Sequence, residues 1–347
     1  MSSMSAIAKM KLAKGVDLHE FPRPVPMDNE VLIKVKISGI CGSDLKLYNI
    51  EAMTARKIAL PIILGHEFCG VVEALGPKVT SLQVGDRVAG EPHIPCMTCF
   101  TCDTGNAHIC PHQKNVGRTV NGSFAEYLTV PEISVRKVPE ALTDHEAALL
   151  EPMGVAVHAV RKNDIAGDNV LVLGCGPIGL MSISAAKAFG AARVFATGRN
   201  PEKLQKGLLM GADQIFNASD KGVTEKIRSQ AGESGIGTVI DMSGSEEAIQ
   251  QGLQVLRPGG TLVLAGIPGK HIDLNALAYN IYNEIRITGI FGRKLWESWI
   301  LSEMLLKQGK IKTEVLMGSS FSVGDYEQAF AEAFSGKSGR TFISFCN

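Results

Sequence analysis

The chain has 347 residues, 45% of them hydrophobic, and its 35 lysines and arginines balance 35 aspartates and glutamates. This length and apolar content allow roughly two domains with sizeable cores. The balanced charge excludes a strongly basic protein that binds nucleic acid or an anionic membrane, and favours one that acts on small molecules. No apolar run reaches the about 18 residues of a membrane-spanning helix and no secretory pattern opens the chain, so we expect a cytoplasmic protein.

Residues 1–150 have the pattern of a β-rich domain. The segment 31–37 alternates in polarity, and short β-branched runs recur between turns that contain glycine or proline. We expect a small, barrel-like domain made of residues 1–155 and 293–347, with the C-terminal stretch packing back on the first half.

Four cysteines in this half have the spacing Cys-x2-Cys-x2-Cys-x7-Cys; they are Cys96, Cys99, Cys102 and Cys110. Four soft ligands on one short loop are the composition of a closed, tetrahedral zinc site. Because such a site has no vacant position for a substrate, this metal would stabilise the domain and take no part in chemistry. The alternatives are two disulfides or reduced cysteines crowded by chance, and the lack of a secretory pattern argues against the disulfides.

After Glu151 the pattern changes to strand, glycine turn, helix, strand. We expect buried strands at 170–173, 192–197, 238–241 and 261–265, and an alanine-rich helix at 182–189. This alternation predicts an α/β fold with a doubly wound parallel sheet over residues 156–292.

A GxGxxG motif follows the strand at 170–173 directly and comes just before the helix. Gly174 would permit the tight turn, Gly176 would let a phosphate approach the backbone, and Gly179 would let the helix lie close to the strand. With Pro177 and Ile178 between them, these residues would hold a dinucleotide pyrophosphate at the helix N-terminus. The alternative is a glycine turn with a purely structural role.

The end of the second strand bears on the choice between NAD and NADP. An acidic residue there would bind the adenosine ribose and repel a 2′-phosphate, but this chain has Gly198 followed by Arg199. Arg199 can bind a phosphate in a bidentate manner, and Lys203 adds positive charge one helical turn later. The sequence therefore favours NADP over NAD, unless Arg199 is an ordinary solvated side chain.

A second set of metal donors is dispersed through the chain and comprises Cys41, His66, Glu67 and Glu151. One thiolate, one imidazole and one or two carboxylates suit zinc with an exchangeable position, which a catalytic site requires. Any one of these residues alone would be weak evidence for a metal site. Together with a four-cysteine loop and a dinucleotide motif in the same chain, the set indicates a catalytic zinc site.

These motifs give the chain a resemblance to the zinc-dependent medium-chain dehydrogenases over essentially its full length. The segments that match in order are 65–67, 85–88, 96–110 and 174–179. The resemblance implies a GroES-like β-rich catalytic domain, a Rossmann domain, two zinc ions per chain, and hydride transfer from an alcohol to NAD(P). It also implies a homo-oligomer, either a tetramer or a dimer. Further expected cofactor contacts are Gly266, Ile267, Ile290 and Phe291.

The resemblance also implies roles for residues near Cys41. Ser43 matches the hydroxyl that begins a proton relay from the substrate, and Asp44 would orient a metal ligand. Lys46 occupies the next relay position, where many relatives have a histidine. Cys41 and His66 are the expected zinc ligands, and either Glu67 or Glu151 would complete the set.

Two segments, 90–96 and 289–299, resemble the L-threonine 3-dehydrogenases more than other branches. His93 matches a histidine that bears on substrate choice there, unless it is only a structural residue beside the cysteine loop. Arg293 belongs to the second segment with Trp296 and Trp299, of which at least one is expected in a core or a subunit contact. Gly198 argues for a different branch, because threonine dehydrogenases typically use NAD. The alternatives are a sorbitol- or butanediol-type polyol dehydrogenase and a non-catalytic protein that binds zinc and NADP.

Overall fold

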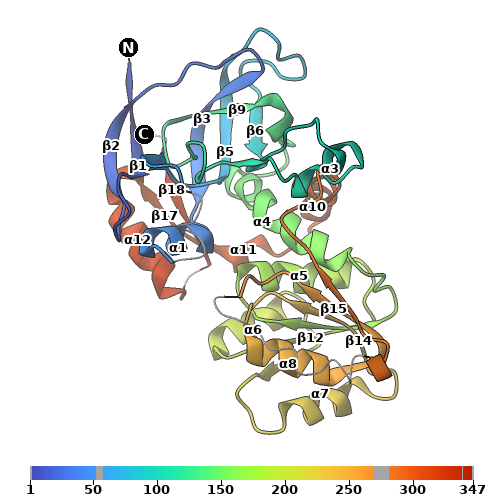
Figure 1. Cartoon of the computed structure of the whole chain (residues 1–347). Helices are drawn as coiled ribbons and strands as arrows, with labels where there is room; N and C mark the ends of the chain where they lie inside the picture. Colours follow the sequence, from blue (N-terminus) through green and yellow to red (C-terminus); the bar gives the residue numbers. More distant parts are fainter. Residues whose placement is uncertain (1, 52–57, 269–280, 338, 346–347) are drawn as a thin grey trace. The chain divides into compact units, whose positions relative to one another are not determined.

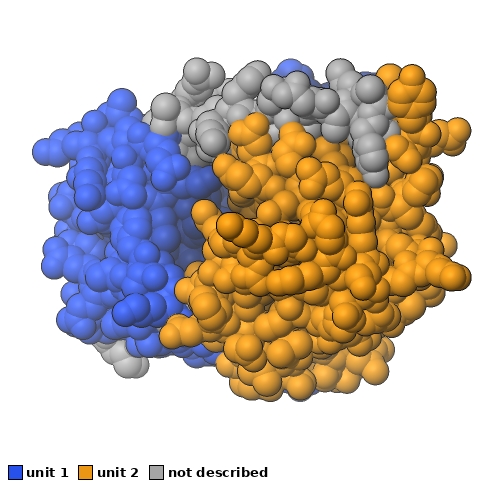
Figure 2. Space-filling model, turned by 90° about the horizontal axis from the view of Figure 1, so that it is seen from below, with its two compact units in different colours: residues 1–151, 317–347 blue, residues 152–316 orange. Residues whose placement is uncertain are grey.

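The computed structural model describes residues 2–51, 58–268, 281–337 and 339–345, and the chain forms two compact units (Figures 1 and 2). Unit 1 consists of residues 1–151 and 317–347, and unit 2 of residues 152–316. This division places 152–155 and 293–316 in unit 2, whereas the sequence assigned them to the first domain. The chain therefore returns to unit 1 only at Met317.

Unit 1 is built on strands, as the sequence predicted. They are β1 (Ser3–Lys9), β2 (Asp17–Pro22), β3 (Glu30–Gly39), β4 (Ile62–Ile63), β5 (Glu67–Leu75), β6 (Arg87–Gly90), β7 (His93–Ile94), β8 (Lys114–Asn115), β9 (Tyr127–Pro131), β10 (Val135–Lys137), β17 (Met317–Ser322) and β18 (Arg340–Ser344). The helices are α1 (Gly42–Asn49), α3 (Phe100–Asp103), α12 (Tyr326–Ser335) and the first part of α4 (Asp144–Val160), with 3-10 turns at Ala107–Ile109, Glu132–Ser134 and Val323–Asp325.

The main sheet of unit 1 has the order β10-β6-β5-β3-β18-β17, and β9 also pairs with β3 (Figure 1). The segment 31–37, predicted as a strand, is the centre of β3 and pairs antiparallel with β5, β9 and β18. The C-terminal strands thus join a sheet formed by the first half of the chain. A three-stranded sheet, β2-β1-β4, and the pair β7-β8 complete the unit.

Unit 2 contains one parallel sheet of six strands in the order β13-β12-β11-β14-β15-β16. The strands are β11 (Asn169–Leu173), β12 (Arg193–Gly198), β13 (Gln214–Asn217), β14 (Ile236–Asp241), β15 (Leu256–Leu264) and β16 (Arg286–Gly289). The helices are α5 (Pro177–Ala188), α6 (Pro201–Leu209), α7 (Val223–Ala231), α8 (Glu246–Val255), α10 (Glu297–Lys307) and α11 (Thr313–Leu316), with the rest of α4. This topology confirms the predicted Rossmann fold, in which ligands bind beyond the carboxyl ends of the strands.

Alternating residues of these strands build cores on both faces of the sheet. Leu171 and Leu173 of β11 pack in one cluster with residues of α7 and α8, whereas Val170 and Val172 point to the opposite face and are equally buried. The helix predicted at 182–189 begins five residues earlier, at Pro177, because proline fits the first turn of a helix. In the described part of the chain, no helix is long and apolar enough to cross a membrane.

Candidate active site and metal centres

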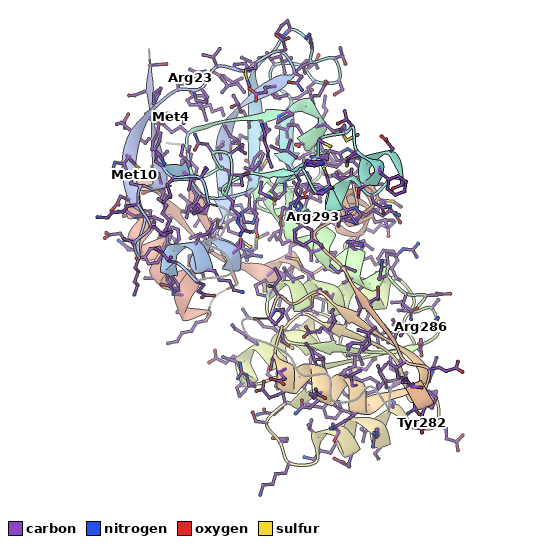
Figure 3. All side chains as sticks on the ribbon, in the orientation of Figure 1. Met4, Met10, Arg23, Tyr282, Arg286 and Arg293 are labelled. Carbon is purple, nitrogen blue, oxygen red and sulfur yellow. The ribbon has the colours of Figure 1, made fainter. Side chains whose placement is uncertain are left out.

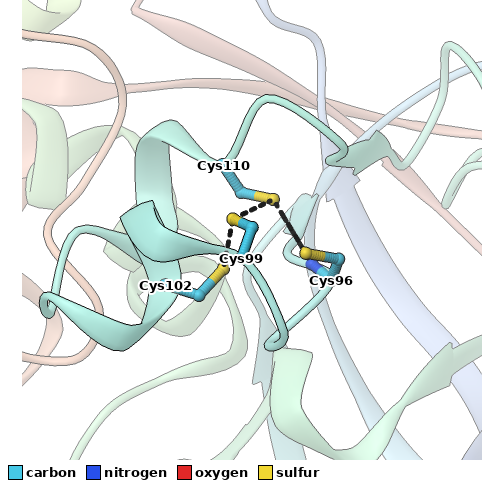
Figure 4. A group of neighbouring side chains, drawn as sticks. All are labelled: Cys96, Cys99, Cys102 and Cys110. Carbon is cyan, nitrogen blue, oxygen red and sulfur yellow. Dashed lines mark hydrogen bonds between the residues drawn. The ribbon is translucent and has the colours of Figure 1, made fainter.

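The four cysteines of the 96–110 loop come together in unit 1 (Figure 4). The Sγ–Sγ distances are 3.5 Å for Cys96 and Cys110, 3.6 Å for Cys99 and Cys102, and 3.8 Å for Cys99 and Cys110. These separations are far longer than a disulfide bond, and all four thiols are free. Ligands about 2.3 Å from a tetrahedral zinc ion would lie about 3.8 Å apart. The sulfur positions therefore fit a closed zinc site.

The backbone around the cysteines contributes to the position and the ionisation of their sulfur atoms. Cys99 immediately precedes α3 and Cys102 lies within it. The Cys110 sulfur accepts hydrogen bonds from the backbone N–H groups of Cys96 and His112, both at 3.4 Å. Hydrogen bonds from the backbone and hydroxyl of Thr98 lower the pKa of Cys96 to about 6. Such donors favour the thiolate form that binds zinc.

The second donor set is only partly brought together. One sulfur, nitrogen or oxygen atom from each of Cys41, His66 and Glu67 lies within 4.8 Å of the other two. Cys41 precedes α1, His66 precedes β5, and Glu67 is the first residue of β5. The fourth predicted donor, Glu151 on α4, is buried, with Oε1 4.0 Å from His66 Nε2.

The protonation state of His66 reflects its anionic surroundings. Burial alone would lower the pKa of His66, but the Asp44 carboxylate and the Cys41 sulfur raise it well above its usual range. Because a metal-bound histidine must release the proton on its ligating nitrogen, zinc and protons compete at this site.

A buried arginine that the sequence analysis missed lies beside Glu67. Arg340 Nε, on β18, is 3.1 Å from Glu67 Oε2, and Arg340 Nη1 donates a 2.9 Å hydrogen bond to the carbonyl of Ile40. Burial raises the pKa of Glu67, while the Arg340 guanidinium opposes that rise. Gly39 makes this arrangement possible, because a Cβ there would stand 2.7 Å from Glu67 Oε2. No local motif marks Arg340, since it comes from the opposite end of the chain.

Asp44 connects the segments that carry the two ligands. Its carboxylate accepts a 2.9 Å hydrogen bond from the backbone of Cys41 and a 3.3 Å bond from that of Gly65, and it lies 3.6 Å from His66 Nδ1. This is the geometry expected of a residue that orients metal ligands. Ser43 and Lys46 are three residues apart on the same helix, both half-buried, and so lie on one face of α1.

His93 is held by a neighbouring acid that the sequence analysis did not single out. Glu91 is fully buried, and its Oε1 lies 3.0 Å from both the backbone nitrogen and Nδ1 of His93. The signal was present in the sequence, since Glu91 belongs to the same 90–96 segment.

The glycine turn of unit 2 agrees with the predicted role of each glycine. Gly174 has φ of +97°, which a side chain would disfavour. A Cβ on Gly179 would stand 1.9 Å from the carbonyl oxygen of Gly174, so only glycine allows this approach of helix to strand. Apart from its chain neighbours, no atom lies within 4 Å of a Cβ built on Gly176, so there is open space beside this residue. Pro177 and Ile178 open α5 directly after it.

The residues after β12 present positive charge. Arg199 is exposed and, within the described residues, has no ion-pair partner, and Lys203 lies in the first turn of α6. Gly198 has no positive φ, and a Cβ there would make only ordinary contacts, the nearest 3.5 Å from Leu204 Cδ2. Neither conformation nor packing therefore requires glycine at this position.

The remaining expected cofactor contacts lie at the carboxyl ends of β15 and β16. Ile267 and Phe291 are 61% and 43% exposed, which is unusual for apolar side chains and leaves them accessible. Ile290 donates a backbone hydrogen bond to Leu264, and Gly266 donates one to the carbonyl of Asp241.

Asp241 organises this edge of the sheet and was missed by the sequence analysis. Its buried carboxylate accepts hydrogen bonds from the backbone and hydroxyl of Ser243, at 2.9 and 2.6 Å, and from the backbone of Gly244. Burial raises the pKa of Asp241, and these hydrogen bonds oppose the rise. The carboxylate thus fixes the loop after β14, beside the glycine turn that follows β11.

The second segment with the threonine dehydrogenase pattern lies in unit 2. Arg293, labelled in Figure 3, is buried, and Gly154 leaves room for its side chain. Trp299 is fully buried and packs edge-to-face on Trp296 at 5.6 Å. This confirms that at least one tryptophan belongs to a core.

Comparisons with known proteins match both halves of the chain. Residues 27–140 match the family model of the alcohol dehydrogenase GroES-like domain, and residues 177–307 match that of zinc-binding dehydrogenases. The chain is 36% identical over 344 residues to an L-threonine 3-dehydrogenase of Coxiella burnetii, covering 99% of each chain. It is 34% identical over 342 residues to an L-threonine 3-dehydrogenase of Shewanella baltica, covering 99% of this chain and 100% of that one.

Solved structures share the fold over nearly the whole chain. A Sinorhizobium meliloti 1021 protein with NADP bound has a TM-score of 0.91 and 27% identity, covering 99% of this chain and 100% of that one. The 2R,3R-butanediol dehydrogenase of Bacillus subtilis has a TM-score of 0.88 and 28% identity, covering 98% and 99%. Together with the two donor sets and the glycine turn, these matches show that the chain belongs to the zinc-dependent medium-chain alcohol dehydrogenase family.

Proposed function

We propose that this NAD(P)-dependent dehydrogenase oxidises the secondary alcohol of L-threonine or of a closely similar small molecule, with NADP as the favoured cofactor. The observation that carries the proposal is the donor set of Cys41, His66 and Glu67 in a chain that aligns end to end with threonine dehydrogenases. Expected cytoplasmic location and assembly into a tetramer or dimer stay predictions.

In this proposal each unit supplies one part of the chemistry. Cys41 and His66 would hold the catalytic zinc, with Glu67 or Glu151 as the third protein ligand. When bound, zinc supplies Lewis-acid activation of an alcohol oxygen and the nicotinamide supplies a hydride acceptor. The second zinc would sit among the four cysteines and stabilise their loop.

The chain's own groups would orient the ligands and move the proton. Asp44 holds the backbone of Cys41 and lies beside the His66 ring, which supports a role in fixing both ligands. Ser43 would accept the proton of the alcohol as it releases its own hydroxyl proton, and Lys46, on the same face of α1, could take up the released proton only in its neutral form. His93, held by Glu91, would contact the substrate and bear on its choice.

The nucleotide turn supports dinucleotide binding in unit 2. The open space beside Gly176 and the N-terminus of α5 would receive the pyrophosphate. The exposed guanidinium of Arg199 and the ammonium of Lys203 would bind a 2′-phosphate, and the missing carboxylate at Gly198 removes the group that would repel it.

Two other functions remain candidates for the test. The likeness to a 2R,3R-butanediol dehydrogenase favours a diol or polyol as the second choice of substrate. A non-catalytic protein that binds zinc and NADP is the third, and the intact donor set argues against it.

The deciding experiment measures the steady-state reduction of NADP and of NAD by zinc-loaded enzyme with L-threonine, sorbitol and 2,3-butanediol. Efficient turnover of L-threonine with NADP supports the proposal. Turnover of the diols alone moves the chain to the polyol branch, and inactivity on all three, with zinc and cofactor bound, supports the non-catalytic alternative.

A further inference from the structure

Glu91 and His93 make a close contact that is almost completely shielded from solvent. Glu91 Oε1 lies 3.0 Å from both the backbone nitrogen and the Nδ1 atom of His93. The Glu91 side chain has no exposed surface and that of His93 has 12%. Burying a carboxylate costs free energy, so buried carboxylates are found where hydrogen bonds compensate for the lost contact with water.

The backbone on both sides of this pair is fixed. Glu91 N–H donates a 2.8 Å hydrogen bond to the carbonyl of Ser134, and the carbonyl of Pro92 accepts a 3.0 Å bond from Val116. The segment that carries the carboxylate and the imidazole therefore has little freedom to rearrange.

Strand pairing relates this segment to β5, the strand that begins at Glu67. Ala89 of β6 pairs with Cys69 of β5 in an antiparallel ladder, so the residues after Ala89 run alongside the residues before Cys69. Gly90 lies close to Phe68, as this pairing requires, because a Cβ on Gly90 would stand 2.5 Å from the Phe68 ring. The segment that carries Glu91 and His93 therefore follows directly on β6, whose partner strand β5 begins at the metal donor Glu67.

We infer that Glu91 is a positioning residue that holds His93 as the Nδ1–H tautomer and directs its Nε2 atom to the substrate. The inference rests on the proposed function, because it assigns Glu91 a part in substrate recognition by His93. A carboxylate can only accept a hydrogen bond, so the ring nitrogen next to it must carry the hydrogen. The opposite ring nitrogen then has a defined direction and, in the neutral ring, a defined acceptor lone pair.

The first test does not depend on turnover. The zinc-loaded enzyme is labelled with ¹⁵N-histidine, and long-range ¹H–¹⁵N correlations give the tautomer of each ring, with His93→Gln identifying the His93 signals. We expect the Nδ1–H form, or the doubly protonated ring at low pH. A neutral His93 ring with its hydrogen on Nε2 would overturn the inference even if the enzyme is active.

The second test is a double-mutant cycle on whichever alcohol the wild type oxidises. We expect Glu91→Gln to lower kcat/KM by roughly tenfold in the wild type and to have almost no further effect in the His93→Ala background. An equal loss in both backgrounds would show that Glu91 acts independently of His93. If Glu91→Gln does not fold, Glu91→Asp replaces it in the cycle.

The matched control is Glu132→Gln, which changes a carboxylate that caps the turn at Thr80 and Ser81. It should leave the ratio of threonine to diol turnover unchanged, whereas Glu91→Gln should alter it with the zinc content constant. If the wild type oxidises no alcohol, the proposed function fails, and the tautomer measurement still decides the role of Glu91.

Discussion

Position 198 shows how one small residue can bear on cofactor choice. Gly198 ends β12 without the positive φ that requires glycine, and a Cβ on it would meet Leu204 only at an ordinary 3.5 Å. A larger residue would therefore fit, and what glycine provides is the absence of a side chain next to Arg199. We interpret this as space for a phosphate.

The first prediction concerns Arg199→Ala. Loss of the guanidinium should raise the KM for NADP by roughly tenfold and leave the KM for NAD nearly unchanged, because only NADP carries the additional phosphate. Steady-state kinetics with both cofactors measure the two effects. Lys206→Ala, which removes a positive charge from the following helix, α6, serves as the control, and equal changes for the two cofactors would dispose of the phosphate contact.

The second prediction concerns Gly198→Asp. The carboxylate should repel a 2′-phosphate and accept hydrogen bonds from a ribose, so the ratio of kcat/KM for NAD to that for NADP should rise by roughly tenfold or more. Gly198→Asn has nearly the same size without the charge and should give a much smaller change. If the two variants behave alike, the effect is steric and the electrostatic argument fails.

Among the elements, the 96–110 loop has little regular structure of its own. Its regular parts are one turn of α-helix, Phe100–Asp103, and one 3-10 turn, Ala107–Ile109, while the apolar side chains of Phe100 and Ile109 are exposed. So little buried apolar surface cannot hold a loop of this length, and a metal bound by four thiolates can.

The third prediction is that Cys99→Ser lowers the zinc content from two ions per chain to one. Removing one of four thiolates from a closed site should also lower the midpoint of thermal unfolding, since binding stabilises only the folded loop. Elemental analysis and calorimetry test this together. Cys175→Ala, which changes a buried thiol outside the loop, should keep both metals. Two zinc ions in Cys99→Ser with an unchanged midpoint would refute the assignment.

For the whole molecule, the two compact units separate the candidate metal donors from the proposed nucleotide site along the chain. Both donor sets belong to unit 1, and the glycine turn and the basic residues after β12 belong to unit 2. We therefore expect zinc to stabilise mainly unit 1 and the dinucleotide to stabilise mainly unit 2.

The fourth prediction uses hydrogen exchange followed by mass spectrometry. Removing zinc with a chelator should increase exchange in residues 96–115 and 41–49 and leave the strands of unit 2 unchanged. Adding NADP should protect residues 174–182 and 198–204, and NAD should protect the second of these segments less. Loss of protection throughout the chain on chelation would show that the units do not respond separately.

Much of the site was predictable because its residues occur in short motifs. The four cysteines lie within one loop and the glycines of the GxGxxG motif within one turn, so local spacing alone was enough to predict that each group lies together. Arg340, Glu91 and Asp241 escaped prediction for different reasons. Arg340 reaches Glu67 only through pairing of β18 with β3, Asp241 is one acid at the end of an apolar strand, and Glu91 was overlooked beside His93.

The sequence by itself determined the two folds, the clustering of the four cysteines and the glycine turn between β11 and α5, because periodicity and close spacing are local properties. Tertiary structure decided which dispersed residues meet. It brings Cys41 and His66 together with Glu67 and pairs Glu67 with Arg340. It also shows that the chain re-enters unit 1 at Met317, whereas the sequence suggested residue 293. The physical reason is that strand pairing joins segments far apart in the chain, and no local pattern specifies which strands will pair.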